Sequence, residues 1–394
     1  MKLKLLLVLP IILAKSAFSN SYFPKNYDSS RTRFLNYSQS LKGKYQRVES
    51  FELPVGSEEL HINSLYIPAQ KKSQKLIIIT SGNHGPEGYA GSALQAMFIE
   101  EVLPQFDLSQ TGILFVHALN PWGFKHHRRG TENNVNLNRN FDVSPELFST
   151  TNDGYDQFKD LLERQGPVSD GNGFVTGSLL WEMISKKAIT QQSLTEAIGK
   201  GQYTAPKGIN YGGEDFEPQT KPMMNLLKKV AQPYQAIFHI DLHTGLGKKN
   251  TLHIMTKRGM NEASLKTQSR LFQNTDDKKM YEITPPEAEG FYEILGDYAD
   301  VLRKMMPEKE RVIVGITAEF GTVGNGLVGK TITINRLILE NQGYYFGYTN
   351  GKAKVQSETN FLELFYPKSE AWKNQVLEKG RFLFQVVAKR FIDN

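Results

Sequence analysis

The 394-residue sequence contains no cysteine. This absence excludes disulfides, a lipid anchor on cysteine and thiolate metal ligands, so any transition-metal ion would have to be held by histidine, aspartate or glutamate. The sequence also has no G-x-S-x-G turn after a strand and no H-E-x-x-H pair, which argues against a serine hydrolase and against the commonest zinc protease motif.

Long apolar runs are also missing, apart from one at the N-terminus. Lys2 and Lys4 precede an apolar run from Leu5 to Ala14, and small residues follow at the spacing of a signal-peptidase site. That run is too short to span a bilayer, so residues 1–19 are predicted to be a secretory signal peptide. The mature protein is therefore expected to be exported without a membrane anchor. The lack of disulfides favours a bacterial periplasmic or secreted location.

The charge balance is nearly even. The whole chain carries a net charge of +6, and the excess falls to about +3 once Lys2, Lys4 and Lys15 leave with the signal. No dense basic run with interleaved aromatic residues occurs, so a nucleic-acid partner is not expected.

Apolar runs alternate with helical patterns along the rest of the chain. Strands are expected at 60–67, 76–79, 112–119, 236–243 and 311–319, the first of them half-exposed. Helices are expected at 90–102 and 370–391. This alternation predicts an α/β fold with a largely parallel, mixed sheet flanked by helices. In such sheets ligands bind beyond the carboxyl ends of the strands, where most of the unusual polar residues fall.

Two of these strand ends carry histidine. His84 and Glu87 follow the strand at 76–79 in the turn N-H-G-P-E-G, and imidazole with carboxylate is a donor pair that suits zinc. Alternatively, His84 only hydrogen-bonds the start of the next helix. In the strand at 236–243, His239, Asp241 and His243 share one face because side chains alternate. Asp241 or His239 could orient a ligand at His243, or the three could form an internal hydrogen-bonded cluster.

Two further blocks carry chemistry. Arg128 and Arg129, followed by Asn138 and Arg139, offer guanidinium groups that can bind carboxylates or an oxyanion, although such loops are often solvated surface. Glu319 ends an apolar strand, where burial would raise its pKa toward that of a general base.

In this order the blocks resemble the zinc carboxypeptidase superfamily. The resemblance covers roughly residues 45–365 and is strongest to a bacterial branch described only as a domain of unknown function, with N-H-G-P-E-G-Y-A-G-S-A, L-N-R-N-F, D-L-H-T-G and A-E-F-G-T blocks. The aspartoacylase and succinylglutamate desuccinylase relatives are similar in their metal set.

The resemblance implies one Zn²⁺ held by His84, Glu87 and His243, with Glu319 as general base. It also implies that Arg129 or Arg128 stabilises the oxyanion, and that Asn138 and Arg139 bind the terminal carboxylate of the substrate. The doubled arginine departs from the family pattern and leaves the oxyanion assignment open between Arg128 and Arg129.

The expected function is an exported zinc hydrolase, most simply a metallocarboxypeptidase, with a peptide or a small acyl-amino acid as substrate. An N-acyl amino acid deacylase and a non-catalytic binding protein on the same scaffold are the alternatives. Residues 45–394 are expected to form a single catalytic domain. Within it, 142–235 has no mapped counterpart and forms either a lid or a surface excursion. Residues 20–44 are an N-terminal extension, either a propeptide or an ordered segment.

Overall fold

The computed structural model describes residues 21–170, 191–272, 277, 279–285, 294–307, 311–324 and 326–393. The predicted signal peptide, residues 1–19, lies outside the described residues. Among the described helices, none combines the length and apolar composition needed to cross a bilayer.

Eight strands form one mixed, mostly parallel sheet with the order β1-β2-β4-β3-β5-β8-β6-β7. The four central strands β4, β3, β5 and β8 run parallel to one another, and the antiparallel pairings lie toward the two edges. The expected α/β fold is therefore confirmed. The strands are β1 (Glu49–Val55), β2 (Leu60–Ile67), β3 (Lys75–Thr80), β4 (Thr111–His117), β5 (Ala236–Gly245), β6 (Leu252–Met255), β7 (Tyr281–Thr284) and β8 (Val312–Gly321).

Both faces of the central sheet are buried, which explains the continuous apolar run of β3. Ile77 and Ile79 belong to the core on one face, whereas Leu76 and Ile78 belong to the core on the other. All four side chains are fully buried, and each contributes on the order of 1.5–3 kcal/mol through removal from water. A strand of this kind requires helices on both sides.

Helices cover both faces of the sheet. On one side lie α2 (Tyr27–Lys42), α3 (Gly88–Met97), α10 (Glu262–Phe272), α14 (Glu370–Phe382) and α15 (Lys389–Asp393), and their buried residues join the first core. On the other side lie α9 (Thr220–Ala231) and α11 (Val301–Met305), which build the second core. The expected helices at 90–102 and 370–391 are present, and each continues from its α-helix into a π-helical turn.

The expectation that the strand at 60–67 is half-exposed is wrong. Every residue of β2 except His61 is buried, because β1 takes the edge position and α2 packs against β2. The Tyr27 hydroxyl on α2 donates a hydrogen bond to the His61 carbonyl (3.2 Å), and Phe34 and Leu41 enter the first core. The described part of the 20–44 extension is thus packed into the fold.

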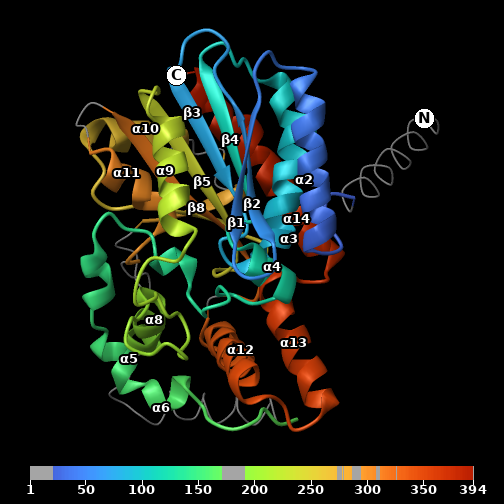
Figure 1. Ribbon diagram of the computed structural model, residues 1–394, viewed down its shortest axis with the longest axis vertical. Helices are drawn as coiled ribbons and strands as arrows, with labels where there is room; N and C mark the ends of the chain where they lie inside the picture. Colours follow the sequence, from blue (N-terminus) through green and yellow to red (C-terminus); the bar gives the residue numbers. More distant parts are fainter. Residues whose placement is uncertain are drawn as a thin grey trace, which may run out of the picture.

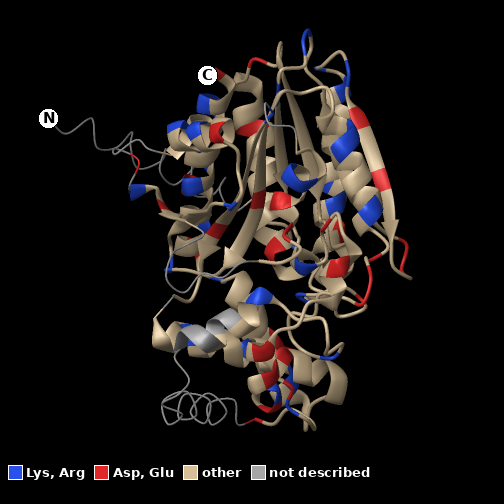
Figure 2. Ribbon diagram, turned by 90° about the vertical axis from the view of Figure 1, so that its left-hand side faces the viewer, with Lys and Arg blue, Asp and Glu red and all other residues tan. Residues whose placement is uncertain are grey.

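A further group of helices lies beyond the carboxyl ends of the parallel strands (Figures 1 and 2). Tyr155, Leu194, Ile334 and Ile338 belong to one apolar cluster, which joins the segment after residue 142 to α12. A cavity lined by residues of both lies between this helical layer and the sheet. The layer consists of α5 (Asp153–Gln157), α6 (Lys159–Leu162), α8 (Gln191–Lys200), α12 (Leu327–Phe346) and α13 (Gly351–Phe365).

Candidate metal centre and active site

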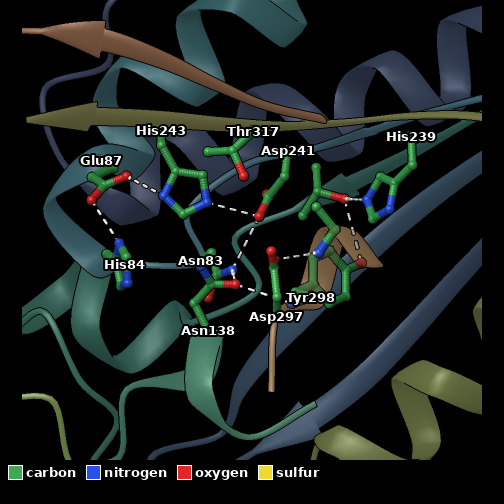
Figure 3. A network of polar contacts seen from close by, with 12 residues as sticks. Asn83, His84, Glu87, Asn138, His239, Asp241, His243, Asp297, Tyr298 and Thr317 are labelled. Atoms are coloured by element: carbon green, nitrogen blue, oxygen red, sulfur yellow. Dashed lines mark hydrogen bonds and ion pairs between the residues drawn. The ribbon is translucent and has the colours of Figure 1, made fainter. Parts of the chain in front are cut away.

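Three buried side chains converge beyond the ends of β3 and β5. His84, Glu87 and His243 each offer a ligand atom, and these atoms all lie within 4.8 Å of one another. His84 Nδ1 lies 2.7 Å from Glu87 Oε1, and His243 Nδ1 lies 2.9 Å from Glu87 Oε2. The structure therefore brings together the three residues expected from the sequence, and the ring nitrogen that faces the carboxylate is Nδ1 in both histidines (Figure 3).

Close backbone packing holds the turn that carries His84 and Glu87. Gly82 after β3 has a positive φ of 65°, a conformation that glycine adopts without strain. A Cβ on Gly85 would lie 2.0 Å from the Gly123 carbonyl carbon and 2.4 Å from the Arg128 carbonyl oxygen. Gly123 lies in the first turn of α4 (Pro121–His126), whose N-cap Asn120 accepts a hydrogen bond from the Gly123 N–H (2.9 Å). The turn N-H-G-P-E-G therefore packs directly against residues 120–123 at the start of α4.

The outer nitrogen of each histidine has its own acceptor. His243 Nε2 lies 2.7 Å from Asp241 Oδ2, and His84 Nε2 lies 3.0 Å from Asn136 Oδ1. A proton on each Nε2 leaves each Nδ1 lone pair free toward Glu87, which is how hydrogen bonds fix the tautomer of a metal-binding histidine. Asp241 was expected as an orienting group from strand alternation. Asn136 was not.

The expected second orienting residue, His239, does not reach the site. Its Nε2 lies 3.2 Å from the Thr80 hydroxyl, and its ring packs against Tyr298 at 5.1 Å. Instead Asn83 joins Asp241 to Asn138, because its Nδ2 lies 3.1 Å from Asp241 Oδ2 and 3.2 Å from Asn138 Oδ1 (Figure 3). The Tyr298 N–H also donates to Asn138 Oδ1 (3.0 Å).

Burial and neighbouring charges set the protonation of the three converging groups. Burial, together with the Arg129 charge, lowers the pKa of His84 to about 4, so its ring is neutral at pH 7. Burial opposes ionisation of Glu87, but His84 and His243 outweigh it and lower the pKa of that carboxyl. Burial alone would lower the pKa of His243, yet Asp241 and Glu87 raise it well above its usual value.

This donor set fits a zinc ion. Two imidazole nitrogens and one carboxylate are the combination found in zinc hydrolase sites, where three protein ligands leave one position for solvent or substrate. All three residues are at most 3% exposed, and the two outer nitrogens have fixed acceptors. A cation here would also balance the buried Glu87 and Asp241 charges.

Glu319 lies next to His243, on the neighbouring strand of the sheet. The two residues are register partners in the parallel β5–β8 pair, and Glu319 Oε1 accepts a hydrogen bond from the Leu246 N–H (2.8 Å). Burial, together with the negative charge of Glu87, raises the pKa of Glu319 to about 8. A carboxyl with a raised pKa beside a metal-ligand set is a typical proton-transfer group.

A cavity of about 130 Å³ contains the three converging residues, Glu319 and Arg129. Arg129 Nη1 donates to Asn210 Oδ1. Arg128 does not line this cavity. It forms an ion pair with Glu340 of α12 at 2.8 Å and stacks on the Tyr344 ring, with Cζ 3.7 Å from the ring centroid. The geometry thus favours Arg129 for contact with a bound substrate, and Arg128 joins the loop to α12.

Asn138 and Arg139 also line the cavity, and both are buried. The Arg139 guanidinium is engaged with backbone carbonyls: Nε donates to Gly199 (3.0 Å), Nη2 donates to the same oxygen, and Nη1 donates to Asn138 (2.7 Å). Part of its hydrogen-bonding capacity is therefore used within the protein.

The 142–235 segment contributes a wall of the site. Ile198 and Asn210 line the cavity, and Asn210 Oδ1 also accepts from Asn136 Nδ2 (3.0 Å). Asn210 thus connects Arg129 with the residue that orients His84. The sequence signal for this role is weak, because Asn210 is one asparagine in a Gly/Tyr-rich stretch, although its positive φ of 54° shows a specific turn.

A family model described as "Protein of unknown function (DUF2817)" matches residues 23–379. Among curated proteins, none matches this sequence. Bovine thrombin-activatable fibrinolysis inhibitor, solved with tick carboxypeptidase inhibitor, is similar in structure: it has 11% identity, the match covers 95% of this chain and 99% of that one, and the TM-score is 0.51.

Two more solved structures are similar at lower scores. Carboxypeptidase A from Helicoverpa armigera has 12% identity, 86% and 74% coverage of the two chains and a TM-score of 0.46. A metallo-carboxypeptidase from Burkholderia cenocepacia has 12% identity, 82% and 71% coverage and a TM-score of 0.42. Of these three structures, the bovine protein has a TM-score above 0.5, and it shows a shared fold. The family model confirms the expected match to a family described only as a protein of unknown function.

Proposed function

Because this chain belongs to the DUF2817 family, whose name carries no activity, we propose its function from the site: a zinc-dependent hydrolase that cleaves an amide bond next to a free carboxylate, as a metallocarboxypeptidase does. The observation that carries the proposal is the convergence of His84, Glu87 and His243 in one cavity with Glu319. A binding protein would need no carboxyl buried beside a metal-ligand set, whereas Glu319 lies there, paired in register with His243 and lining the same cavity.

Each residue of the cavity has a role in this reaction. Zinc, held by His84, Glu87 and His243, would supply a Lewis acid that activates water and polarises a carbonyl. Glu319 takes the proton of the attacking water and passes it to the leaving nitrogen. The half-buried Arg129, oriented by Asn210, donates to the oxyanion as charge develops, and loss of one such donor costs on the order of 10²–10³-fold in rate.

Asn138 and Arg139 bind the free carboxylate of the substrate in this proposal. Both lie in the cavity wall, and Asn138 is held by Asn83 and by the Tyr298 backbone. The N–H groups of Arg139 that do not contact Gly199 or Asn138 supply the charge-assisted contact. We further propose that the protein is exported, on the basis of the signal-like residues 1–19.

The proposal is tested on purified protein by metal analysis and by hydrolysis of peptides with free or amidated C-termini. We expect about one zinc per chain, loss of metal in His84→Ala and His243→Ala, and cleavage of the free peptides only. Glu319→Gln keeps its zinc and loses on the order of 10²–10⁴-fold in rate. The matched control Glu282→Gln changes a half-exposed carboxylate on β7 and keeps full activity. Zinc-loaded Glu319→Gln with wild-type activity rejects the mechanism.

The cavity also supports a second candidate, deacylation of N-acyl amino acids. Ile198 and Asn210 of the 142–235 segment and residues of α12 form walls of the cavity close to the three converging residues. Such walls restrict a long peptide more than a small acyl-amino acid. Comparing acyl-amino acids with peptides of increasing length distinguishes the two, because a deacylase loses activity as the chain lengthens.

A further inference from the structure

One face of α12 forms a wall of the catalytic cavity. Lys330, Thr333, Ile334 and Leu337 line it, and their spacing of three, four and seven residues puts them on the same side of the helix. The Thr333 hydroxyl is engaged, because it donates to the Gly329 carbonyl (3.0 Å). Lys330 is therefore the polar group that this helix face offers to a bound molecule.

Lys330 differs from the other two cations of the cavity in its pairing. Arg129 contacts Asn210, and Arg139 contacts the carbonyls of Gly199 and Asn138. The half-buried Lys330 side chain forms no hydrogen bond or ion pair with any residue that the structure describes. Its three N–H donors are therefore available to a ligand.

The charge of the cavity favours an anion at this position. Three cationic side chains, Arg129, Arg139 and Lys330, line the cavity together with the two carboxylates Glu87 and Glu319, and a zinc ion would add two further positive charges. Much of the remaining wall is apolar, with Ile198, Ile334, Leu337 and Phe365, and an apolar surround strengthens a charge pair.

We infer that Lys330 is a specificity-determining residue that pairs with a second carboxylate of the substrate, in addition to the one next to the scissile bond. This inference rests on the proposed function and adds a substrate class to it, namely dianionic amides such as those of acidic amino acids. The neutral isostere of such a substrate leaves the Lys330 ammonium without a partner, and charge-assisted hydrogen bonds of this kind change affinity by about tenfold or more.

The test measures binding without turnover. Zinc-loaded Glu319→Gln protein is titrated calorimetrically with N-acetyl-L-glutamate and with N-acetyl-L-glutamine, which differ only in a carboxylate and a carboxamide. We expect the glutamate ligand to bind at least about tenfold more tightly. Adding Lys330→Ala removes this preference, and adding Lys330→Arg retains it. Lys352→Ala, which changes a lysine on α13 with a 79% exposed side chain, is the matched control and leaves the preference intact.

The inference is overturned if Lys330→Ala leaves the ratio of the two affinities unchanged, if it weakens both ligands equally, or if neither ligand binds. Zinc content and thermal unfolding, recorded for every variant, separate a specific effect from loss of the site. Failure of the proposed function is a different result, because a protein that hydrolyses no amide can still show the Lys330-dependent preference. Conversely, hydrolysis without any preference for acidic substrates rejects only the role of Lys330.

Discussion

Asp241→Asn tests whether the fixed outer hydrogen bond of His243 sets metal affinity. Asp241 is fully buried, and its Oδ2 is 2.7 Å from His243 Nε2 and 3.1 Å from Asn83 Nδ2. Asparagine has nearly the same shape and can place its amide oxygen at the Oδ2 position, so both hydrogen bonds can persist. The negative charge is lost, and the amide nitrogen takes the place of Oδ1, which has no hydrogen-bond partner among the described residues.

The size of the effect follows from these two changes. Loss of the carboxylate makes the His243 ring a weaker ligand, and changes to such outer partners lower metal affinity by about 10–100-fold, or roughly 1.4–2.8 kcal/mol. The stranded amide N–H group costs a further 1–3 kcal/mol or so of folding free energy, because it is buried without an acceptor. We therefore expect both weaker zinc binding and a lower unfolding midpoint.

Zinc affinity is measured by competition with a chromophoric chelator at about pH 8, where proton competition for the histidine ligands is small. His239→Gln is the matched control, because His239 lies on the same strand face but contacts Thr80 rather than a converging residue. It should lower stability without changing zinc affinity. Wild-type zinc affinity in Asp241→Asn, or an equal loss in His239→Gln, would refute the reasoning.

Three further predictions concern residues that are not themselves proposed ligands. Gly85→Ala should abolish zinc binding, because the added Cβ would overlap the backbone of Gly123. In the control Gly351→Ala the added Cβ meets no atom within 4 Å, so zinc binding should stay intact. Metal analysis of the two purified variants measures the difference. Glu340→Gln should destabilise the fold by about 3–5 kcal/mol, because it leaves the buried Arg128 charge unpaired; unchanged urea unfolding would contradict this. Burial, with the charges of Arg33 and Arg31, lowers the pKa of His117 to about 3, so below about pH 6.5 the unfolded chain binds a proton there that the folded chain does not. The free energy of unfolding should therefore decrease by up to about 1.4 kcal/mol for each unit that the pH is lowered below about 6.5. His117→Gln should weaken this pH dependence, which urea titrations from about pH 7 to pH 4 measure.

The sheet and the three converging residues were predictable for one physical reason. Central parallel strands are buried on both faces and leave unbroken apolar runs, such as the one that ends at Ile79. Polar residues directly after such runs must lie at one edge of the sheet, so His84, His243 and Glu319 were expected together. Alternation along β5 then identified Asp241 as a neighbour of His243.

The same reasoning failed where partners come from loops or later helices. His239 lies on the same face of β5 as Asp241, but its Nε2 contacts the hydroxyl of Thr80 on β3. No sequence pattern within β5 could show this contact. Arg128 and Arg129 are adjacent in sequence, and only the position of Glu340 on α12 separates their roles. The last two strands of the sheet order, β6 and β7, are four residues long, too short to give a periodic signal.

The walls of the cavity were the least predictable part. Lys330 lies on a helix whose spacing resembles that of any amphipathic helix, and nothing in that pattern shows that its inner face covers a site. Asn210 likewise belongs to a segment with no recognised motif. Such residues gain their role from tertiary packing between α12, α8 and the sheet, and only the structure reports that packing.

The sheet and α12 position different residues of the cavity. The register of β5 against β8 pairs His243 with Glu319 and Asp241 with Thr317, and a shift of one residue would turn all of these side chains to the opposite face. Lys257 reinforces this register at Thr317, because its Nζ contacts both the Thr317 hydroxyl (2.8 Å) and Asp297. The sheet therefore positions Asp241, His243 and Glu319, whereas α12, which forms another wall of the cavity, positions Lys330. In the proposed function, a substitution on α12 therefore changes the preferred substrate without moving the proposed metal ligands or Glu319.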